Sequence, residues 1–364
     1  MSKKRFVKVL SVVVAAVLMI STFAACGNTE TPPAAGSNAG GGQAASGDVI
    51  TLKVQSQDPE NGATGRFLEE WAAAVEEASG GRLDINIFHG ATLGPATESF
   101  NMVESGAVDI AWGLPSMTTG KFPLTDVGAL PFTAEDTLQA SYALWDLYDS
   151  TDYLKDEWSS VKVIVLHANC DSPLLLVDKK VESIDDLKGL SSRFIGGAST
   201  DFANLVGAIP STMAINDIYT NLEKGVVDAA ANCGWDVVDS FRLYEQAEYI
   251  LDWHLNINPY FLVMNLDTYN SLPADLQAVI DEYSGYKALE YVGTKWQDIK
   301  ASCMELNADK VYSLSDAEQQ KAVELGEQVA QDWIASVTAN GADGQGLYDA
   351  WMERVEKYED KIAK

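Results

Sequence analysis

The sequence lacks the motifs on which many catalytic sites are built. It contains only three histidines, His89, His167 and His254, which are far apart and have no evident nucleophile beside them. There is no Gly-x-Ser-x-Gly elbow, no His-Glu-x-x-His, no Gly-x-Gly-x-x-Gly after a strand and no phosphate-binding loop. We therefore expect structural histidines, no metal, no cofactor and no enzymatic activity, although folding could bring distant groups together.

Basic residues and cysteines are also scarce. The chain carries 25 Lys and Arg against 53 Asp and Glu, a net charge of −28, which disfavours nucleic acid and anionic lipid surfaces as partners. Carboxylates are so frequent that no Asp/Glu pair can be assigned acid–base work. Beyond Cys26 only Cys170, Cys233 and Cys303 occur, without metal-ligand spacing, so buried or free thiols are favoured over a disulfide.

The N-terminus carries an apolar run that is too short to span a bilayer. Four basic residues precede the run, Val9 to Ile20, and two alanines and Cys26 follow it, so residues 1–25 are interpreted as a signal peptide. The end of this segment resembles a bacterial lipoprotein cleavage box, in which Cys26 becomes the lipidated first residue. Phe23 departs from that pattern, and the alternative is an ordinary signal peptide cut after the alanines.

Residues 26–47 have almost no apolar bulk. They are mostly Gly, Ala, Ser, Pro, Asn and Thr, and such a stretch cannot bury enough surface to offset its ordering entropy. A flexible tether is predicted here, as suits a chain that is fixed to a membrane at one end.

Strand and helix patterns alternate through the rest of the chain, which favours parallel βαβ units and an α/β fold. Strands are predicted at Ile50–Val54, Leu83–Ile87, Val108–Trp112, Lys162–Ala168 and Leu190–Ile195. Helices are predicted from Phe67 to Ala78, from Pro95 to Gly106 and over most of the chain after Ala274. A further short helix is predicted to begin at Ser183, which forms a capping box with Asp186, and to end at Gly189.

Residues 100–111 and 219–230 resemble each other. Both segments read as an aromatic residue, a Glu, a glycine stop and a buried strand that begins with Val-Asp, which indicates two related α/β lobes. Ligands of open α/β sheets bind beyond the carboxyl ends of the strands. We therefore expect Trp112 and the Asn232–Trp235 stretch to face a shared cleft, where tryptophans offer flat apolar walls.

A series of short motifs occurs in a characteristic order. They are Ala78 to Leu83, Ala91 to Gly94, Gly106 to Ile110, Lys121 to Leu124, Leu130 to Phe132, Asp186 to Arg193, and Ile218 to Asp228 with Asn232 four residues on. Together they resemble the DctP-type extracytoplasmic solute-binding proteins of TRAP transporters, over essentially all of Val49 to Tyr358.

The resemblance implies an α/β, periplasmic-binding-protein-like (Venus flytrap) fold. Two lobes, crossed by a long helix, close over a ligand that is delivered to a permease driven by an ion gradient. Lobe I is expected to comprise residues 49–170 and 259–298, and lobe II residues 171–258 and 299–364. A ligand-presenting sensory co-receptor and, less favoured, a secreted enzyme are the alternatives.

The resemblance also implies a carboxylate site. Its arginine is Arg193, whose guanidinium fork matches two carboxylate oxygens. Without the resemblance, a lone arginine in so acidic a chain would more often form a surface salt bridge. Asn232 is a second partner or closes an Asx turn. Gln57 and Asn258 are further polar candidates. Trp112 and Trp235 either line the cleft or fill cores.

One departure from the family narrows the ligand. Members that bind sugar acids or dicarboxylates often carry a second arginine near residues 169–173, and none is present here. The loss of such contacts, each worth on the order of 1.5–3 kcal/mol, favours a monocarboxylate with an apolar or aromatic body. Asp171 is a candidate contact for a hydroxyl or an amine.

Overall fold

The computed structural model describes residues 47–362, which belong to one compact unit. The predicted signal peptide and the predicted lipidation site, Cys26, lie outside the described residues, as does all of the predicted tether except Gly47. No helix among the described residues is long and apolar enough to cross a membrane.

The first sheet has five strands in the order β2-β1-β3-β10-β4. Its first three strands run parallel to one another, while β10 is antiparallel to both of its neighbours. The strands are β1 (Ile50–Gln55), β2 (Leu83–Phe88), β3 (Ile110–Gly113), β4 (Val161–Ala168) and β10 (Pro259–Asn265).

The second sheet has six strands in the order β11-β9-β5-β8-β6-β7. Here β6 is parallel to β7 and β8, and β5 is antiparallel to β8 and β9. The strands are β5 (Leu174–Leu176), β6 (Ser191–Arg193), β7 (Ile209–Ser211), β8 (Ala229–Ala230), β9 (Tyr249–Leu251) and β11 (Val311–Tyr312). Two sheets built on the same parallel core confirm the α/β, two-lobed prediction.

Amphipathic helices cover the sheets. In α1 (Ala63–Ala78) the residues Phe67, Trp71 and Val75 are buried at helical spacing, as predicted. The other helices of the first sheet's region are α2 (Ser99–Glu104), α3 (Thr137–Ser150), α7 (Leu266–Ser271) and α8 (Ala274–Glu282), with 3-10 turns at Ala96–Glu98, Pro115–Met117 and Thr125–Ala129.

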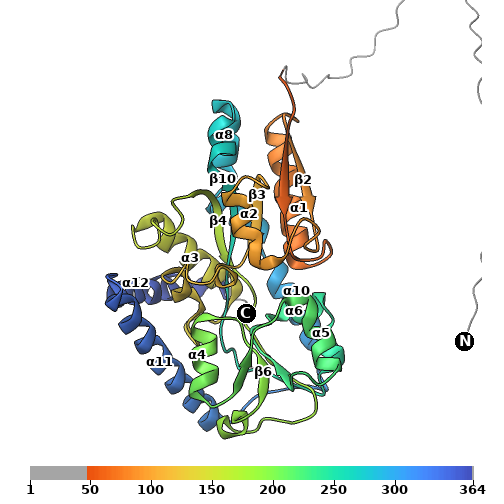
Figure 1. Ribbon diagram of the computed structural model, residues 1–364, viewed down its shortest axis with the longest axis vertical. Helices are drawn as coiled ribbons and strands as arrows, with labels where there is room; N and C mark the ends of the chain where they lie inside the picture. The colour runs from red at the N-terminus through yellow and green to blue at the C-terminus, as the bar shows by residue number, and fades with distance from the viewer. Residues whose placement is uncertain (1–46, 363–364) are drawn as a thin grey trace, which may run out of the picture. The chain divides into compact units, whose positions relative to one another are not determined.

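Around the second sheet lie α4 (Gly197–Leu205), α5 (Ile215–Glu223) and α6 (Trp235–Ser240), with 3-10 turns at Ile184–Leu187 and Leu243–Gln246. The predicted capping box of Ser183 and Asp186 is confirmed, and it starts a 3-10 turn. Figure 1 shows α1, β2 and α8 at one end of the molecule and α5, α6 and β6 at the other.

The helix that crosses between the two sheets is divided. It consists of α9 (Tyr286–Val292), which packs on α1, α3 and β4, and α10 (Lys295–Leu306), which packs on α6 as well as α1. Gly293, with φ of 50°, separates them, because this backbone conformation ends a helix.

A helical hairpin follows. α11 (Asp316–Ala339) packs on α4 beside the second sheet, while α12 (Gly344–Lys357) packs on α3 beside the first, and a 3-10 turn spans Glu359–Lys361. The lobe boundaries stay a prediction, and α12 lies against lobe I although residues 299–364 were assigned to lobe II.

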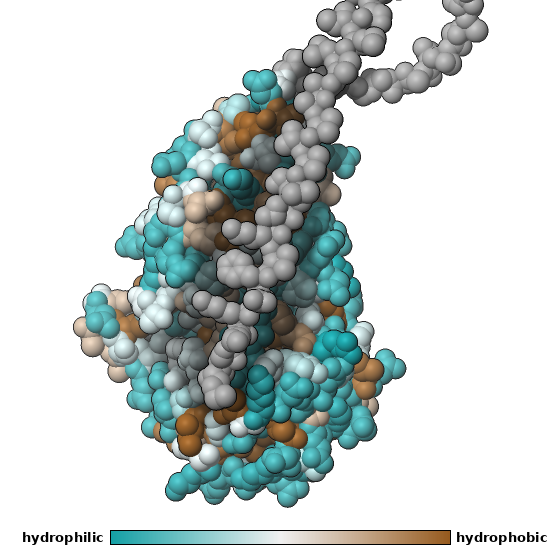
Figure 2. Space-filling model, turned by 45° about the vertical axis from the view of Figure 1, so that its right-hand side comes forward, coloured by the Kyte–Doolittle hydropathy of each residue, from teal (hydrophilic) through white to brown (hydrophobic). Residues whose placement is uncertain are grey.

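The surface reflects the acidic composition. Figure 2 shows it as largely hydrophilic with scattered apolar patches on the visible face. The described large apolar residues that are exposed, among them Leu93, Ile209 and Leu306, come from separate elements. Single exposed apolar residues are normal for a globular protein and identify no particular surface.

Candidate functional site

Arg193 stands at the end of β6 and is 1% exposed. Its Nη1 donates hydrogen bonds to the backbone oxygens of Asn232 at 2.8 Å and Ala231 at 3.3 Å, while its Nε has no hydrogen-bond partner. No carboxylate among residues 47–362 forms an ion pair with it. Burial lowers the pKa of the guanidinium. A buried cation without a counter-ion is costly, so the position favours an anionic partner.

Asn232 follows β8 and adopts a left-handed backbone conformation with φ of 54°. Asparagine tolerates this conformation better than most residues. Its Nδ2 donates to Ser199 Oγ at 2.6 Å and to Asn256 Oδ1 at 3.4 Å, whereas its Oδ1 is buried without a partner. The side chain thus reaches residues of other segments.

A chain of asparagines joins this residue to Asn258. Asn256 Nδ2 donates to Asn258 Oδ1 at 3.0 Å, and the backbone N–H of Asn258 donates to Asn169 Oδ1 at 2.7 Å. The Nδ2 of Asn258 has no partner. The structure therefore brings Arg193, Asn232 and Asn258 into one network through hydrogen bonds.

Gln57 lies just beyond β1 and is 4% exposed, with its Oε1 unpaired. Its neighbour Asp58 is also buried and accepts a hydrogen bond from Thr64 Oγ1 at 2.6 Å. Burial raises the pKa of Asp58 to about 6. On α6, burial and then the charge of Asp58 raise the pKa of Asp236 to about 7.

Trp112 and Trp235 are both completely buried. The Nε1 of Trp112 donates to Nε2 of His167 at 3.0 Å, and its ring meets that of Tyr260 edge-on with centroids 4.4 Å apart. Burial lowers the pKa of His167 to about 3, so this histidine stays neutral and can accept that bond. Trp235 opens α6, and its backbone N–H donates to Asp171 O at 3.3 Å.

Tyr260, at the start of β10, was not identified from the sequence. It is 2% exposed, and burial raises the pKa of its phenol well above the usual value, so the phenol stays neutral. Its place directly after the Asn258-Pro259 step was the available signal. A buried aromatic ring beside Trp112 is suited to contact an apolar ligand body.

These features are those of a two-lobed solute-binding protein with a buried arginine that has no counter-ion among the described residues. The model of the bacterial extracellular solute-binding protein family 7, DctP, matches residues 55–336, and the chain belongs to that family. Its members act outside the cytoplasm as solute receptors of TRAP transporters.

Two of the solved structures that are similar to this chain hold aromatic acids. A TRAP solute-binding protein of Rhodoferax ferrireducens T118, in complex with copurified benzoate, is 26% identical with a TM-score of 0.80, and the match covers 86% of this chain and 100% of that one. One of Bordetella bronchiseptica with bound (R)- and (S)-mandelate is 25% identical with a TM-score of 0.78, covering 85% and 100%.

Curated relatives are matched over shorter lengths. The 2,3-diketo-L-gulonate-binding periplasmic protein YiaO of Escherichia coli K12 is 25% identical over 207 residues, which cover 57% of this chain and 63% of the relative. A solute-binding protein of Sulfitobacter sp. NAS-14.1 is 27% identical over 239 residues, covering 64% and 70%. The chain thus spans about two thirds of the length of these relatives.

Proposed function

We propose that the protein captures a small monocarboxylate with an apolar or aromatic body between its lobes. The observation that carries the proposal is Arg193, a fully buried guanidinium with no ion-pairing carboxylate in the described chain. A ligand carboxylate would supply the missing charge in bidentate geometry. Asn232 and Asn258, each with an unpaired polar atom, are proposed as its neighbours.

The aromatic or apolar body is inferred from three features. Tyr260 and Trp112 are buried in contact with each other, residues 169–173 contain no arginine, and similar proteins hold benzoate and mandelate. A second anionic group would find no guanidinium in that segment.

Closure follows from contacts in both lobes. Arg193 and Asn232 belong to the second sheet's region, whereas Gln57 and Trp112 belong to the first. A ligand that touches both sides favours the closed arrangement by its differential affinity for it. We infer that this closed form is what an ion-gradient-driven permease recognises.

The test is a thermal-shift screen of the purified protein with benzoate, mandelate, branched monocarboxylates, dicarboxylates and neutral analogues. Binding to the folded state raises the melting temperature by mass action. We expect stabilisation by aromatic monocarboxylates, which Arg193→Ala abolishes. Stabilisation only by uncharged compounds, or undiminished stabilisation of the variant, would refute the carboxylate anchor.

Delivery to a permease and release of the unchanged ligand are separate parts of the proposal. Mass spectrometry of the acid recovered after incubation with the protein distinguishes a receptor, which returns it unchanged, from an enzyme, which converts it. Permease genes next to this gene would support transport, whereas a sensor gene alone would favour the sensory alternative.

Anchoring through lipidated Cys26 is likewise proposed. The basic, apolar and small-residue segments before Cys26 carry this inference. The full chain, expressed in a bacterium, should partition into detergent and lose that property in Cys26→Ser. Equal partitioning of both proteins into the aqueous phase would refute the anchor.

A further inference from the structure

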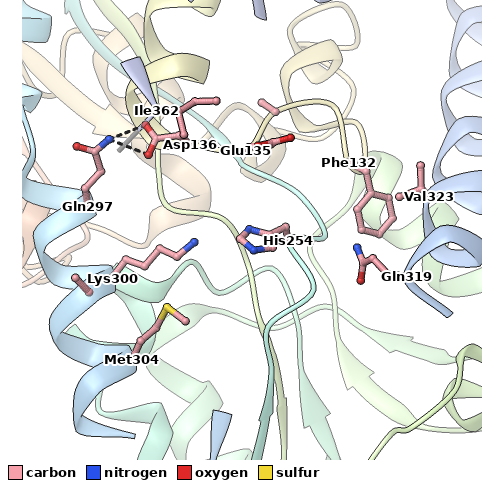
Figure 3. A pocket seen from close by; sticks show the side chains of 12 residues that line it. Phe132, Glu135, Asp136, His254, Gln297, Lys300, Met304, Gln319, Val323 and Ile362 are labelled. Carbon is pink, nitrogen blue, oxygen red and sulfur yellow. Dashed lines mark hydrogen bonds between the residues drawn. The ribbon is translucent and has the colours of Figure 1, made fainter. Parts of the chain in front are cut away.

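Asp171, the candidate contact for a ligand hydroxyl or amine, is paired with cations of the chain itself. Lys300 Nζ lies 2.6 Å from its Oδ1, and His254 Nδ1 lies 2.9 Å from its Oδ2. Figure 3 shows the Lys300 side chain pointing toward the His254 ring across a pocket that both residues line. The contact with Asp171 raises the pKa of His254, which favours the protonated imidazole. A ligand amine would therefore find Asp171 already neutralised.

Two other buried carboxyls have no such partners. Asp58 lies just beyond β1 and is 5% exposed, and Asp236 lies in the first turn of α6 and is 3% exposed. No Lys, Arg or His of residues 47–362 forms an ion pair with either of them. In each, Oδ1 is buried without a hydrogen-bond partner. Burial of an ionised carboxylate is costly unless a cation reaches it.

The loop that carries Asp58 meets the helix that carries Asp236. A Cβ added to Gly62, at the end of this loop, would lie 2.8 Å from Oγ of Ser240, the last residue of α6. Oδ2 of Asp236 accepts a hydrogen bond from Nε1 of Trp296 at 3.1 Å. Trp296 belongs to α10, which packs on α1, the helix that directly follows the loop. The loop and α6 thus contact each other across the boundary between the regions of the two sheets.

Asp236 also borders the residues proposed for the ligand carboxylate. A Cβ added to Gly234 would lie 2.4 Å from Oδ1 of Asp236 and 2.5 Å from Nδ2 of Asn169, so these two atoms face the same backbone position. Cys233, the residue before this glycine, accepts a hydrogen bond from Nη1 of Arg193 at 3.4 Å. The unpaired oxygen of Asp236 therefore lies over the turn that the arginine contacts.

Aromatic residues join Asp236 to the proposed site of the ligand body. The ring of Trp296, which donates to Asp236, meets the ring of His167 with centroids 5.2 Å apart. The same His167 ring meets that of Tyr260 at 5.5 Å. Burial, and then the charges of Asp236 and Asp58, raise the pKa of the Tyr260 phenol. One aromatic cluster thus supports both the carboxyl of Asp236 and the ring proposed to contact the ligand.

The buried unpaired atoms of these residues are of two kinds. The donors, Nε of Arg193 and Nδ2 of Asn258, suit a ligand carboxylate. The acceptors are four oxygens, one each from Gln57, Asp58, Asn232 and Asp236. A primary ammonium has three N–H donors and no acceptor, so it suits the second set.

The charges favour the same group. With both carboxyls ionised, Arg193, Asp58 and Asp236 sum to one negative charge. A simple monocarboxylate would add a second negative charge, whereas a ligand with both a carboxylate and an ammonium would add none. Its positive end would lower the cost of burying the two acids.

We propose that the ligand carries a protonated primary amine in addition to its carboxylate, and that Asp58 and Asp236, together with Gln57, bind this ammonium. The ligand class is then an amino acid, in the general sense of one carboxylate and one amine, with an apolar or aromatic body. The inference rests on the proposed function, since Arg193 still binds the carboxylate. The sequence did not indicate these two acids, because carboxylates are so frequent in it.

Calorimetric titration of the protein with two pairs of acids that differ by the amine tests the inference. The pairs are phenylalanine with 3-phenylpropionate, and 4-(aminomethyl)benzoate with 4-methylbenzoate, which place the amine at two distances from the carboxylate. At pH 8 both carboxyls are ionised, because their pKa values are about 6 and about 7. We expect at least one amino compound to bind at least tenfold more tightly than its amine-free partner.

Variants assign this preference to the two acids. Asp58→Asn and Asp236→Asn should each reduce it to less than threefold, because each removes a negative charge from the ammonium site and keeps the shape of the side chain. The matched control is Asp126→Asn. Burial raises the pKa of Asp126, in the 3-10 turn Thr125–Ala129, to about 7 as well, so this change removes a comparable carboxyl elsewhere and should leave the preference unchanged.

The outcomes separate this inference from the proposed function. If both amino compounds bound no more tightly than their amine-free partners while those partners or benzoate bound, the inference would be wrong and the carboxylate anchor would stand. A preference that persisted in both variants would also overturn it. If none of the acids bound, with or without an amine, the proposed function itself would fail.

Discussion

In both sheets a helix, a glycine turn and a strand preceded by Val-Asp follow one another, but the residue at the end of the neighbouring strand differs. In the first, the Asp109 N–H donates to Lys53 O, and Asp109 Oδ2 accepts from the Lys53 N–H at 2.9 Å. In the second, Asp228 makes the same two bonds with Ser191, with the side-chain bond at 3.3 Å. The internal similarity of the sequence therefore reflects one structural unit used twice.

The shared register identifies the counterpart of Arg193. Gln55 pairs with Ala111 as Arg193 pairs with Ala230, so a neutral amide occupies in the first sheet the place of the guanidinium in the second. Gln55 Nε2 is tied to Gly94 O at 3.0 Å, whereas the arginine is bonded only to backbone oxygens and a thiol. The common step builds the fold, and the residue at the strand end decides what each lobe can bind.

The largest effect is expected from Arg193→Gln, which gives the second sheet the residue of the first. Loss of two charge-assisted hydrogen bonds, about 1.5–3 kcal/mol each, should weaken carboxylate binding at least a hundredfold. Stability without ligand should be no lower, because a buried unpaired charge is removed. Calorimetric titration and urea unfolding measure both quantities.

Gln55→Ala is the matched control. It should reduce stability, since the buried amide and its bond to Gly94 are lost, while ligand affinity changes less than tenfold. If the two variants lost affinity equally, the assignment of the charge-binding role to the second sheet alone would be wrong.

A second comparison concerns two buried carboxyls, those of Asp58, just beyond β1, and Asp236, on α6. The pKa values of Asp58, about 6, and Asp236, about 7, are raised by burial. The folded protein therefore binds these protons more tightly than the unfolded chain does. Ionisation of the two carboxyls destabilises the folded form, and this destabilisation is absent below about pH 4 and complete above pH 7. Asp236→Asn should stabilise the protein by on the order of 2 kcal/mol at pH 8, Asp58→Asn by less, and neither at pH 4.

Urea midpoints at the two pH values test this prediction. The double variant should gain less than the sum of the single ones, because the charge of Asp58 contributes to the raised pKa of Asp236. Equal shifts at both pH values would show that the gain does not come from titration.

The third comparison tests the repeated aspartates themselves. Asp109→Ala removes bonds from the Lys53 N–H and from Thr268 Oγ1, and should cost about 2 kcal/mol. Asp228→Ala removes one longer bond at an exposed position and should cost about 1 kcal/mol. The reverse order in urea unfolding would contradict the ranking drawn from these geometries.

Much of the fold could be predicted because local patterns determine it. The buried face of α1, its stop at Gly80 and Gly81, and the capping box at Ser183 all follow from neighbouring residues. The break at Gly293 was not predicted, because a glycine within a helical pattern is often tolerated.

The site was predicted less completely. Arg193 could be named from a resemblance, but its lack of an ion-pairing partner depends on how distant segments pack. When the two sheets are compared by their strand pairing, Trp112 of the first corresponds to Ala231 of the second and not to Asn232. The two tryptophans, Trp112 and Trp235, therefore do not occupy equivalent positions.

The smallest effect is expected at the turns that precede the two aspartates. Gly106 and Gly225 have φ of 75° and 64°. A Cβ added at Gly106 would meet its nearest atom at 3.6 Å, and one added at Gly225 would meet no atom within 4 Å. An alanine at either position therefore costs only backbone strain. Each Gly→Ala change should destabilise by about 1 kcal/mol in urea unfolding. Lys224→Ala, at a residue with φ of −87°, should leave stability nearly unchanged. Since the two turns have the same geometry, the losses of stability of the two glycine variants should agree within about 0.5 kcal/mol. A larger difference would mean that the turns are alike in sequence but contribute differently to stability.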